Sequence, residues 1–172
     1  DDQEWANAAA RPLTRNHPFW NLVPRDIPLL REDEIDAQSL VNQGEIKERP
    51  EPVERIHIEF LAEINSFKIN ENNPVSAVNV QVYPTPEGKA RVLTFDFGRV
   101  EVGYLQLDVT GPAGTVIDVL YAEQLWEGRA ILTSDNRPAD RFILAEGRNK
   151  MEVAFGWKAF RYAQVIVRNH KG

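Results

Sequence analysis

Four acidic side chains in the second half of the chain are of a type that could perform acid–base chemistry. They are Asp96, Glu123, Asp135 and Asp140. Hydrolysis of a glycosidic bond needs two carboxyl groups across a pocket, one protonated and one ionised. The spacing of these four residues selects no such pair, and the sequence therefore predicts no catalytic residue within this chain.

A long segment after a predicted strand combines residue types that recognise sugars. It runs from Glu123 to Arg141 and includes "LWEGRAILTSDNRPADR", and long loops of sandwich proteins often carry function. An exposed Trp126 could stack on the apolar face of a sugar ring. Hydrogen-bond acceptors and donors would come from Glu123, Asn136 and Arg137. These four residues are the predicted carbohydrate-binding residues.

The same residues also have a purely structural interpretation. Trp126 could close one end of a sandwich by packing against its core. Glu123 could pair with Arg141 or Arg161, because buried charges are usually paired. The surface around Trp126 distinguishes the two interpretations: an exposed, concave surface favours ligand binding, and a buried tryptophan favours a scaffold.

The sequence predicts no metal site and no other cofactor. The segment "SDNRPAD" (134–140) has several oxygen donors but lacks the glycine-centred spacing of a calcium-binding EF-hand loop. The three histidines have no partner at metal-ligand spacing. The chain has no cysteine, which excludes disulfides, zinc–thiolate sites and cysteine nucleophiles. "GPAG" (111–114) is predicted to be a hairpin turn and not a phosphate-binding loop, because no helix follows it.

Charge and hydropathy exclude two classes of partner. The 172 residues carry a formal net charge of −6, with a pI of about 5.2, so the chain lacks the positive field that attracts nucleic acid. No apolar run reaches the roughly 18 residues that a membrane span needs. The first residues, "DDQEWANAAARP", resemble no signal peptide and lack an initial Met, which indicates a fragment of a longer protein. The sequence assigns no compartment, and an extracytoplasmic parent enzyme is compatible with it.

Period-two alternation of apolar residues dominates the chain from about residue 53. It occurs at 56–60, 78–82, 93–97 and 105–109, with Gly, Pro and Asn turns between these segments. Residues 115–125 are apolar on both faces, which suits a central strand, and 151–169 indicates two strands joined around Gly156. In the second of these strands, Ala163 and its alternate neighbours point away from Gln164. We expect an all-β fold, an antiparallel β-sandwich or jelly roll.

The first 52 residues differ in composition and predict an extended, Pro-rich N-terminal arm. Four prolines between residues 12 and 28 disfavour a helix. The apolar residues of the arm should be buried against a surface, either of this domain or of a neighbouring domain; they are Phe19, Trp20, Leu22, Ile27 and Leu30. Residues 32–44 could form one short helical turn that ends at Gly44. The predicted domains are therefore an arm or connector at 1–52 and a β-sandwich at 53–172, with Trp157 and Phe160 in its core.

Seven short motifs follow one another in a characteristic order. They are Asp96-Phe97-Gly98, Gly103-Tyr104, Gly111 to Gly114, Tyr121-Ala122-Glu123, Gly128-Arg129, Asp140-Arg141-Phe142 and Ala159-Phe160-Arg161-Tyr162. This order resembles the β-sandwich domain of bacterial α-L-rhamnosidases, glycoside hydrolase family seventy-eight. The arm "FWNLVPRDIPLL" (19–30) resembles the connector that these enzymes place between β domains.

The resemblance implies a non-catalytic accessory domain, cut from a glycoside hydrolase. In these enzymes the catalytic acids lie in a separate helical (α/α)6 barrel after this domain, so the implied partner is a downstream barrel of the same polypeptide. The implied ligand is a rhamnose-containing glycan. Two alternatives stay open: a purely structural scaffold domain with no ligand, and a self-contained enzyme.

Two departures from the family pattern bear on the ligand. Ala159 stands where the closing motif usually has Gly. Sugar-binding versions of the domain are expected to hold calcium with an acid and an amide after the Asp-x-Gly motif, but Arg99 and Val100 occupy that turn here. Calcium requires oxygen ligands, so the sequence disfavours a calcium-dependent sugar site.

Overall fold

The structure is a computed structural model that describes residues 24, 26–29, 31–48, 63–64, 66–71, 74–131, 139–153 and 155–169. The chain divides into two compact units, Asp1–Glu34 and Ile35–Gly172. The described residues of the first unit form neither helix nor strand. Most of the apolar arm residues lie outside the described residues, namely Phe19, Trp20, Leu22 and Leu30. Ile27 is 59% exposed, and its burial against this domain or a neighbouring one stays a prediction.

Eleven strands are present in the described residues. They are β1 (Ser39–Lys47), β2 (Lys68–Glu71), β3 (Val75–Ser76), β4 (Lys89–Gly103), β5 (Gln106–Gly111), β6 (Val116–Ala122), β7 (Gln124–Trp126), β8 (Arg129–Ile131), β9 (Ala139–Ile143), β10 (Gly147–Glu152) and β11 (Lys158–Arg168). Seven strands form one sheet in the order β2-β1-β4-β11-β6-β9, with β3 paired to β1; β5 pairs with β10, and β7 with β8. Every pair is antiparallel. The predicted all-β antiparallel fold is confirmed.

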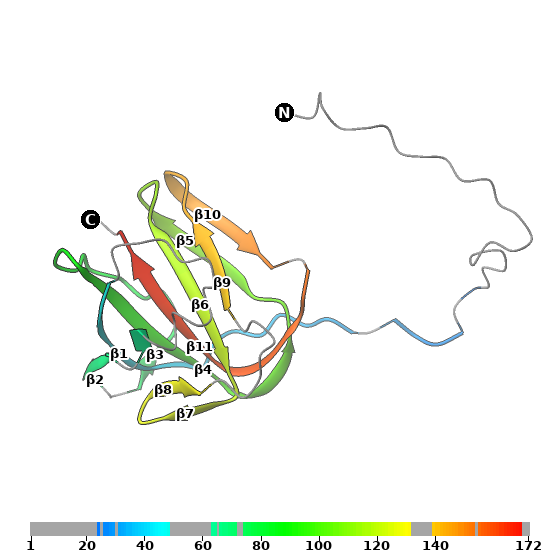
Figure 1. The fold of residues 1–172 in the computed structure, drawn as a ribbon. Helices are drawn as coiled ribbons and strands as arrows, with labels where there is room; N and C mark the ends of the chain where they lie inside the picture. Colours follow the sequence, from blue (N-terminus) through cyan, green and yellow to red (C-terminus); the bar gives the residue numbers. More distant parts are fainter. Residues whose placement is uncertain are drawn as a thin grey trace, which may run out of the picture. The chain divides into compact units, whose positions relative to one another are not determined.

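Both faces of the large sheet are covered, as Figure 1 shows for the pairs β10–β5 and β7–β8. One face packs against β5 and β10 and forms the interior of the sandwich. The buried residues of this first cluster are Leu40, Leu93, Leu105, Ile117, Val119, Tyr121, Leu144, Phe160, Ala163, Val165 and Val167. The other face packs against the turn at 63–67 and the β7–β8 hairpin. Its buried residues are Ile46, Ile64, Phe67, Ala90, Val92, Leu120, Ala122, Ala130 and Ile166.

Most of the predicted strands are present. The alternating segments 93–97 and 105–109 lie in β4 and β5, and residues 151–169 contain the end of β10 and all of β11. Segment 115–125 contains β6, which lies between β11 and β9 and is buried on both faces. Ala163 and Ile166 belong to opposite clusters, as the alternation of β11 predicts. The segment 56–60 lies outside the described residues.

Two local predictions are wrong. Residues 78–82 form no strand, although Val80 and Val82 still pack against the first cluster. Partial burial of alternate side chains is enough to produce the sequence pattern, whereas a β-strand also requires backbone hydrogen bonds to a neighbouring strand. The "GPAG" turn joins β5 to β6, and these strands lie in different sheets. It is therefore a connection between the two layers and not a hairpin turn.

The predicted boundary at residue 52 is also wrong. β1 (Ser39–Lys47) lies inside the predicted arm, yet it pairs with β4 along eight residues of the large sheet. Its buried positions include Asn42 and Gly44, which interrupt the apolar alternation and hide the strand from a sequence pattern. Gly44 ends no helical turn. It allows the backbone of Lys68 to approach so closely that a Cβ at this position would lie 1.9 Å from the Lys68 carbonyl oxygen.

Among the described residues, no helix is long and apolar enough to cross a membrane.

Candidate functional site

The β7–β8 hairpin carries the central residue of the predicted sugar site. Its two-residue turn has positive φ at both positions, 48° at Glu127 and 75° at Gly128, the geometry of a type I′ hairpin. Trp126 is the last residue of β7 and is 69% exposed. It does not plug the end of the sandwich, so the structural interpretation of this tryptophan is wrong.

A row of buried polar side chains holds the hairpin against the large sheet. Asn42 of β1 and Gln164 of β11 both lie opposite Thr94 of β4. All three are at most 3% exposed. Buried polar groups are stable only when they are hydrogen-bonded, and the partners of this row are largely backbone groups of the hairpin.

Gln164 makes the largest number of these bonds. Its Oε1 accepts a hydrogen bond from the Ala130 N–H at 3.1 Å. Its Nε2 donates to the Gly128 carbonyl oxygen at 3.1 Å and to Thr94 Oγ1 at 2.7 Å. Asn42 Nδ2 donates to the same Gly128 carbonyl at 3.1 Å. The hairpin is therefore a fixed support for Trp126, and the alternation of β11 alone revealed no such role for Gln164.

Glu123 is exposed where β6 passes into β7. The expected pairing with Arg141 or Arg161 is not found, because these arginines form bidentate pairs with Asp118 and Asp96 respectively. The carboxylate of Glu123 is thus available to solvent beside the hairpin. The other two predicted binding residues, Asn136 and Arg137, lie outside the described residues.

Asp96 has a structural role and joins two of the sequence motifs. Its carboxylate accepts hydrogen bonds from Arg161 at 2.8 and 2.9 Å and from the Gly98 N–H at 2.7 Å. The hydrogen bond from Arg161 lowers the pKa of Asp96, and the Gly98 bond acts in the same direction. A carboxyl group that is held ionised in this way is unsuited to the role of general acid.

The aromatic residues of the motifs also meet inside the fold. The ring of Phe160 lies 5.3 Å from that of Phe97, edge to face, and 4.9 Å from that of Tyr121. Phe160 is buried, as the sequence predicts, whereas Trp157 is 63% exposed and its predicted place in the core is wrong. Three motifs that are distant in the sequence therefore form one packing cluster.

A buried network of charges lies on the face of the large sheet that packs against the β7–β8 hairpin, opposite the aromatic cluster. Asp118 accepts hydrogen bonds from Arg141 at 2.6 and 2.8 Å and from Arg168 at 2.7 Å. Arg168 also pairs with Glu63 at 2.5 Å, which ties the helical turn at 63–64 to β11. Burial raises the pKa of the neighbouring Glu48, against the attraction of Arg168. The network is fully paired, so it stabilises the fold and leaves no carboxylate of Asp118 for catalysis.

The described residues contain no cluster of three or more His, Cys, Asp or Glu that could hold a metal ion. The residues after the Asp96-Phe97-Gly98 motif, predicted to lie in a turn, continue β4 in the structure, and there Arg99 pairs with Glu101.

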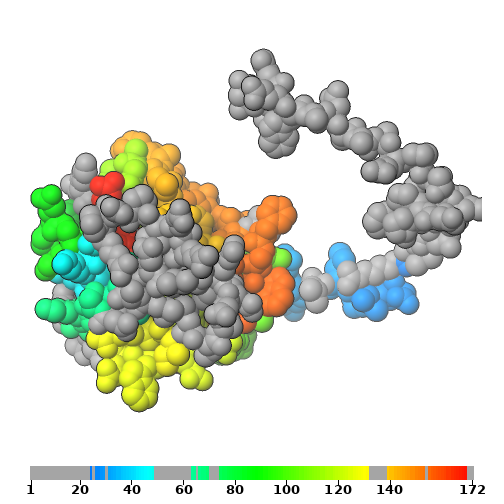
Figure 2. Space-filling model, in the orientation of Figure 1, coloured from blue at the N-terminus to red at the C-terminus, as the bar shows by residue number. Residues whose placement is uncertain are grey.

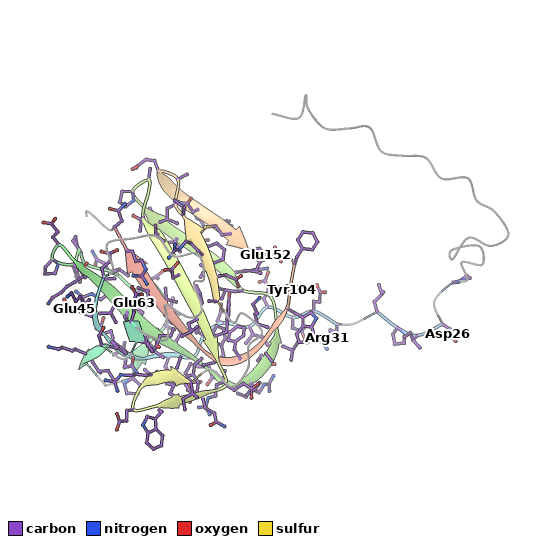
Figure 3. The ribbon with its side chains drawn as sticks, in the orientation of Figure 1. Asp26, Arg31, Glu45, Glu63, Tyr104 and Glu152 are labelled. Atoms are coloured by element: carbon purple, nitrogen blue, oxygen red, sulfur yellow. The ribbon has the colours of Figure 1, made fainter. Side chains whose placement is uncertain are left out.

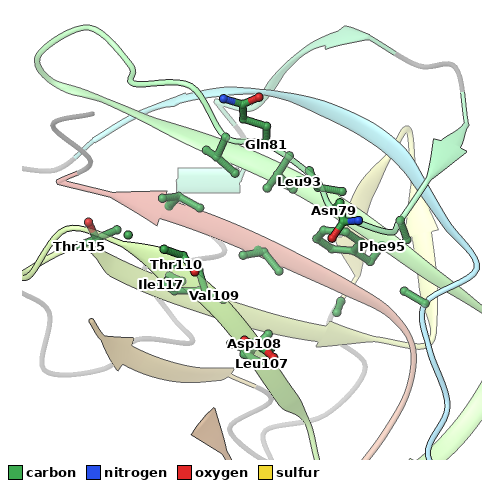
Figure 4. A pocket seen from close by; sticks show the side chains of 18 of the residues that line it. Asn79, Gln81, Leu93, Phe95, Leu107, Asp108, Val109, Thr110, Thr115 and Ile117 are labelled. Carbon is green, nitrogen blue, oxygen red and sulfur yellow. The ribbon is translucent and has the colours of Figure 1, made fainter. Parts of the chain in front are cut away.

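A cavity of about 840 Å³ opens between the large sheet and β5. Figure 4 shows Leu93 and Phe95 on one side and Leu107 and Val109 on the other. The lining is mixed, because polar side chains such as Asn79, Gln81 and Asp108 stand among the apolar ones. Neither Glu123 nor Trp126 lines the cavity, so the predicted sugar site and this cavity are separate.

Comparison with known proteins identifies the class of domain. Residues 87–171 match the family model described as the bacterial alpha-L-rhamnosidase concanavalin-like domain. This is the family of domains that the order of the motifs indicated. No match was found among curated proteins.

Solved structures of rhamnosidases resemble the chain. The GH78 family rhamnosidase of Bacillus sp. GL1 is 24% identical with a TM-score of 0.50, and the match covers 61% of this chain and 12% of that enzyme. The alpha-L-rhamnosidase from Dictyoglumus thermophilum is 24% identical over 54% of this chain and 10% of its own, with a TM-score of 0.41. A rhamnosidase from Klebsiella oxytoca with rhamnose bound is 15% identical, with a TM-score of 0.42, and the match covers 80% of this chain and 26% of that protein. The first likeness supports the β-sandwich fold.

Proposed function

We propose that the chain is a non-catalytic accessory domain of a larger α-L-rhamnosidase-like glycoside hydrolase, in which it supports a helical catalytic barrel. The match of residues 87–171 to the concanavalin-like domain of bacterial rhamnosidases carries this proposal. The paired state of Asp96 and Asp118 agrees with it, because neither carboxylate is available for acid–base chemistry. The purified chain should not hydrolyse an aryl α-L-rhamnoside. Turnover that disappears when one of its own carboxylates is mutated would contradict the proposal.

A second part of the proposal is that the β7–β8 hairpin binds rhamnose-containing glycan. The observation that supports it is the exposure of Trp126 on a support that buried hydrogen bonds hold in place. Glu123 supplies an acceptor nearby, and we propose Asn136 and Arg137 as further polar contacts. An open hairpin buries less of a small ligand than a deep pocket does, so the affinity should be weak. Calcium should have little influence, since Arg99 and Val100 occupy the positions where oxygen ligands would be needed, and Arg99 pairs with Glu101.

The test is an NMR titration of the chain with L-rhamnose, with and without a chelator. Chemical shift changes should concentrate at the Trp126 indole and in the segment 123–141, and the chelator should not alter them. Trp126→Ala should abolish these changes, while Trp157→Ala, which removes another exposed tryptophan, should not. Shifts confined to other loops, or lost on chelation, would refute the location or the metal-free mode.

The alternative is a structural scaffold without a ligand. It is favoured by the contacts of Asp96, Phe160 and Arg161, because these motif residues join strands of the fold. An absence of shifts at millimolar rhamnose would make this alternative the better description.

A further inference from the structure

Five large apolar side chains are exposed around one end of the strand pair β4–β11. The exposed fractions are 48% for Val100, 66% for Val102, 44% for Tyr104, 92% for Phe155 and 63% for Trp157. Figure 3 labels Tyr104 near this end, and in Figure 2 the orange segment that joins β10 to β11 stands out from the surface. None of these five residues belongs to the sugar site proposed above, and none lines the cavity.

The ladder between β4 and β11 brings these side chains together. Val102 lies opposite Ala159, and Gly103 lies opposite Lys158. Tyr104 and Trp157 are the next residues along the two strands, so they are neighbours across the end of the ladder. Alternation along β4 places Val100, Val102 and Tyr104 on one face. Phe160, one residue beyond Ala159, turns to the other face and is buried. Phe155 lies two residues before Trp157, so the five residues define an apolar patch at this end of the strand pair.

The composition of the patch favours a protein surface over a sugar. A sugar platform needs hydrogen-bonding groups beside its aromatic rings, whereas Val100 and Val102 contribute only aliphatic surface here. The nearest charged residues on β4, Arg99 and Glu101, pair with each other. Exposed patches of this kind on a soluble domain mark contacts with other proteins.

The size of the patch indicates which protein contact it suits. The three aromatic side chains alone expose roughly 400 Å², since each can bury 150–250 Å². A stable interface between separate molecules buries about 800 Å² on each partner. Interfaces between domains of one chain are smaller, from about 600 Å² in total, because the tether supplies a high effective concentration. The patch is large enough for a tethered domain and small for a dimer of this chain.

We propose that this patch, made by Val100, Val102, Tyr104, Phe155 and Trp157, is the docking face for another domain of the same polypeptide. The surface that covers it presents aliphatic and aromatic side chains and leaves no unpaired charge in the contact. The inference rests on the proposed function, in which the chain is one domain of a larger enzyme. It adds the surface by which the accessory domain is held.

Hydroxyl-radical footprinting of this chain and of its full-length parent tests the inference. Trp126 and Trp157 are a matched pair, because their exposed fractions in the isolated chain are 69% and 63%. Both should be oxidised at similar rates in the isolated chain. In the parent, oxidation of Trp157 should fall about five-fold or more, since the centre of an interface is desolvated, and Trp126 should stay reactive. Equal oxidation of Trp157 in the two proteins would overturn the inference.

Two further outcomes would overturn it in favour of another occupant. Sedimentation that shows a dimer of the isolated chain, dispersed by Trp157→Ser, would assign the patch to a second copy. Protection of Trp157 in the isolated chain by millimolar L-rhamnose would assign it to sugar. The proposed function fails separately, when the parent shows no rhamnosidase activity. An active parent with an unprotected Trp157 would therefore reject the docking face alone.

Discussion

Gln164→Met should destabilise the domain strongly, although it removes no apolar contact and little volume. The variant leaves the Ala130 N–H and the Thr94 hydroxyl without their partner, while the Gly128 carbonyl keeps the bond from Asn42. A buried polar group that loses its partner costs about 1–3 kcal/mol, so two such groups should lower the free energy of unfolding by about 2–6 kcal/mol. This is a large share of the roughly 5–15 kcal/mol that stabilises a typical domain.

Urea unfolding followed by circular dichroism measures the loss, and Gln106→Met is the matched control. Gln106 is exposed on β5, so its replacement should change the unfolding free energy by less than about 0.5 kcal/mol. Amide exchange adds a local readout: the Ala130 N–H should lose protection in Gln164→Met before the central strands do. If Gln164→Met costs no more than the control, or if exchange at Ala130 is unchanged, the row of buried polar residues does not hold the hairpin.

Three other substitutions test the geometry. Gly128→Ala should destabilise the hairpin by about 1–3 kcal/mol in urea unfolding, because φ is +75° and the new Cβ would lie 2.9 Å from Asn42 Nδ2; a neutral outcome would contradict the tight turn. Asp96→Asn should lower the free energy of unfolding at pH 7. Because Arg161 lowers the pKa of Asp96, the difference in stability between the variant and the wild type should vanish as the pH falls through that lowered pKa. A difference in stability that persists in acid would argue against the ion pair. Glu48→Gln should raise stability at neutral pH, because burial raises the pKa of Glu48 and its ionised form opposes folding there, and this gain should disappear below pH 4 in thermal unfolding; a loss of stability at neutral pH would refute it.

The site shows where local patterns stop being informative. Trp126 was a candidate because its residue type suits sugar stacking, and its exposure agrees with that role. Trp157 has the same residue type and was expected in the core, yet it is nearly as exposed. A tryptophan is buried or exposed according to what packs above it, and no property of the neighbouring sequence distinguishes these two.

The sequence by itself determined the all-β class and the resemblance to the rhamnosidase β-sandwich domain, together with the positions of β4, β5, β6 and β11. These features depend on alternation and on the order of short motifs, and both are properties of adjacent residues. Apolar alternation does not reveal a strand whose buried face carries polar residues or glycine, and β1, with Asn42 and Gly44 at buried positions, was missed for that reason.

Only the tertiary structure decided which residues act together. Asp96 and Arg161 are 65 residues apart in the sequence, and the pairing of β4 with β11 brings them within hydrogen-bond distance. Asn42 and Gln164 are further apart in the sequence, and the pairing of β1, β4 and β11 places them on either side of Thr94, where both donate to the Gly128 carbonyl. Strand order depends on the burial and backbone pairing of the whole chain at once, so no local signal encodes it. The tertiary structure thus shows that the aromatic residues of three motifs form one packing cluster. It also shows that part of the segment predicted as a loop is an anchored hairpin with an exposed tryptophan.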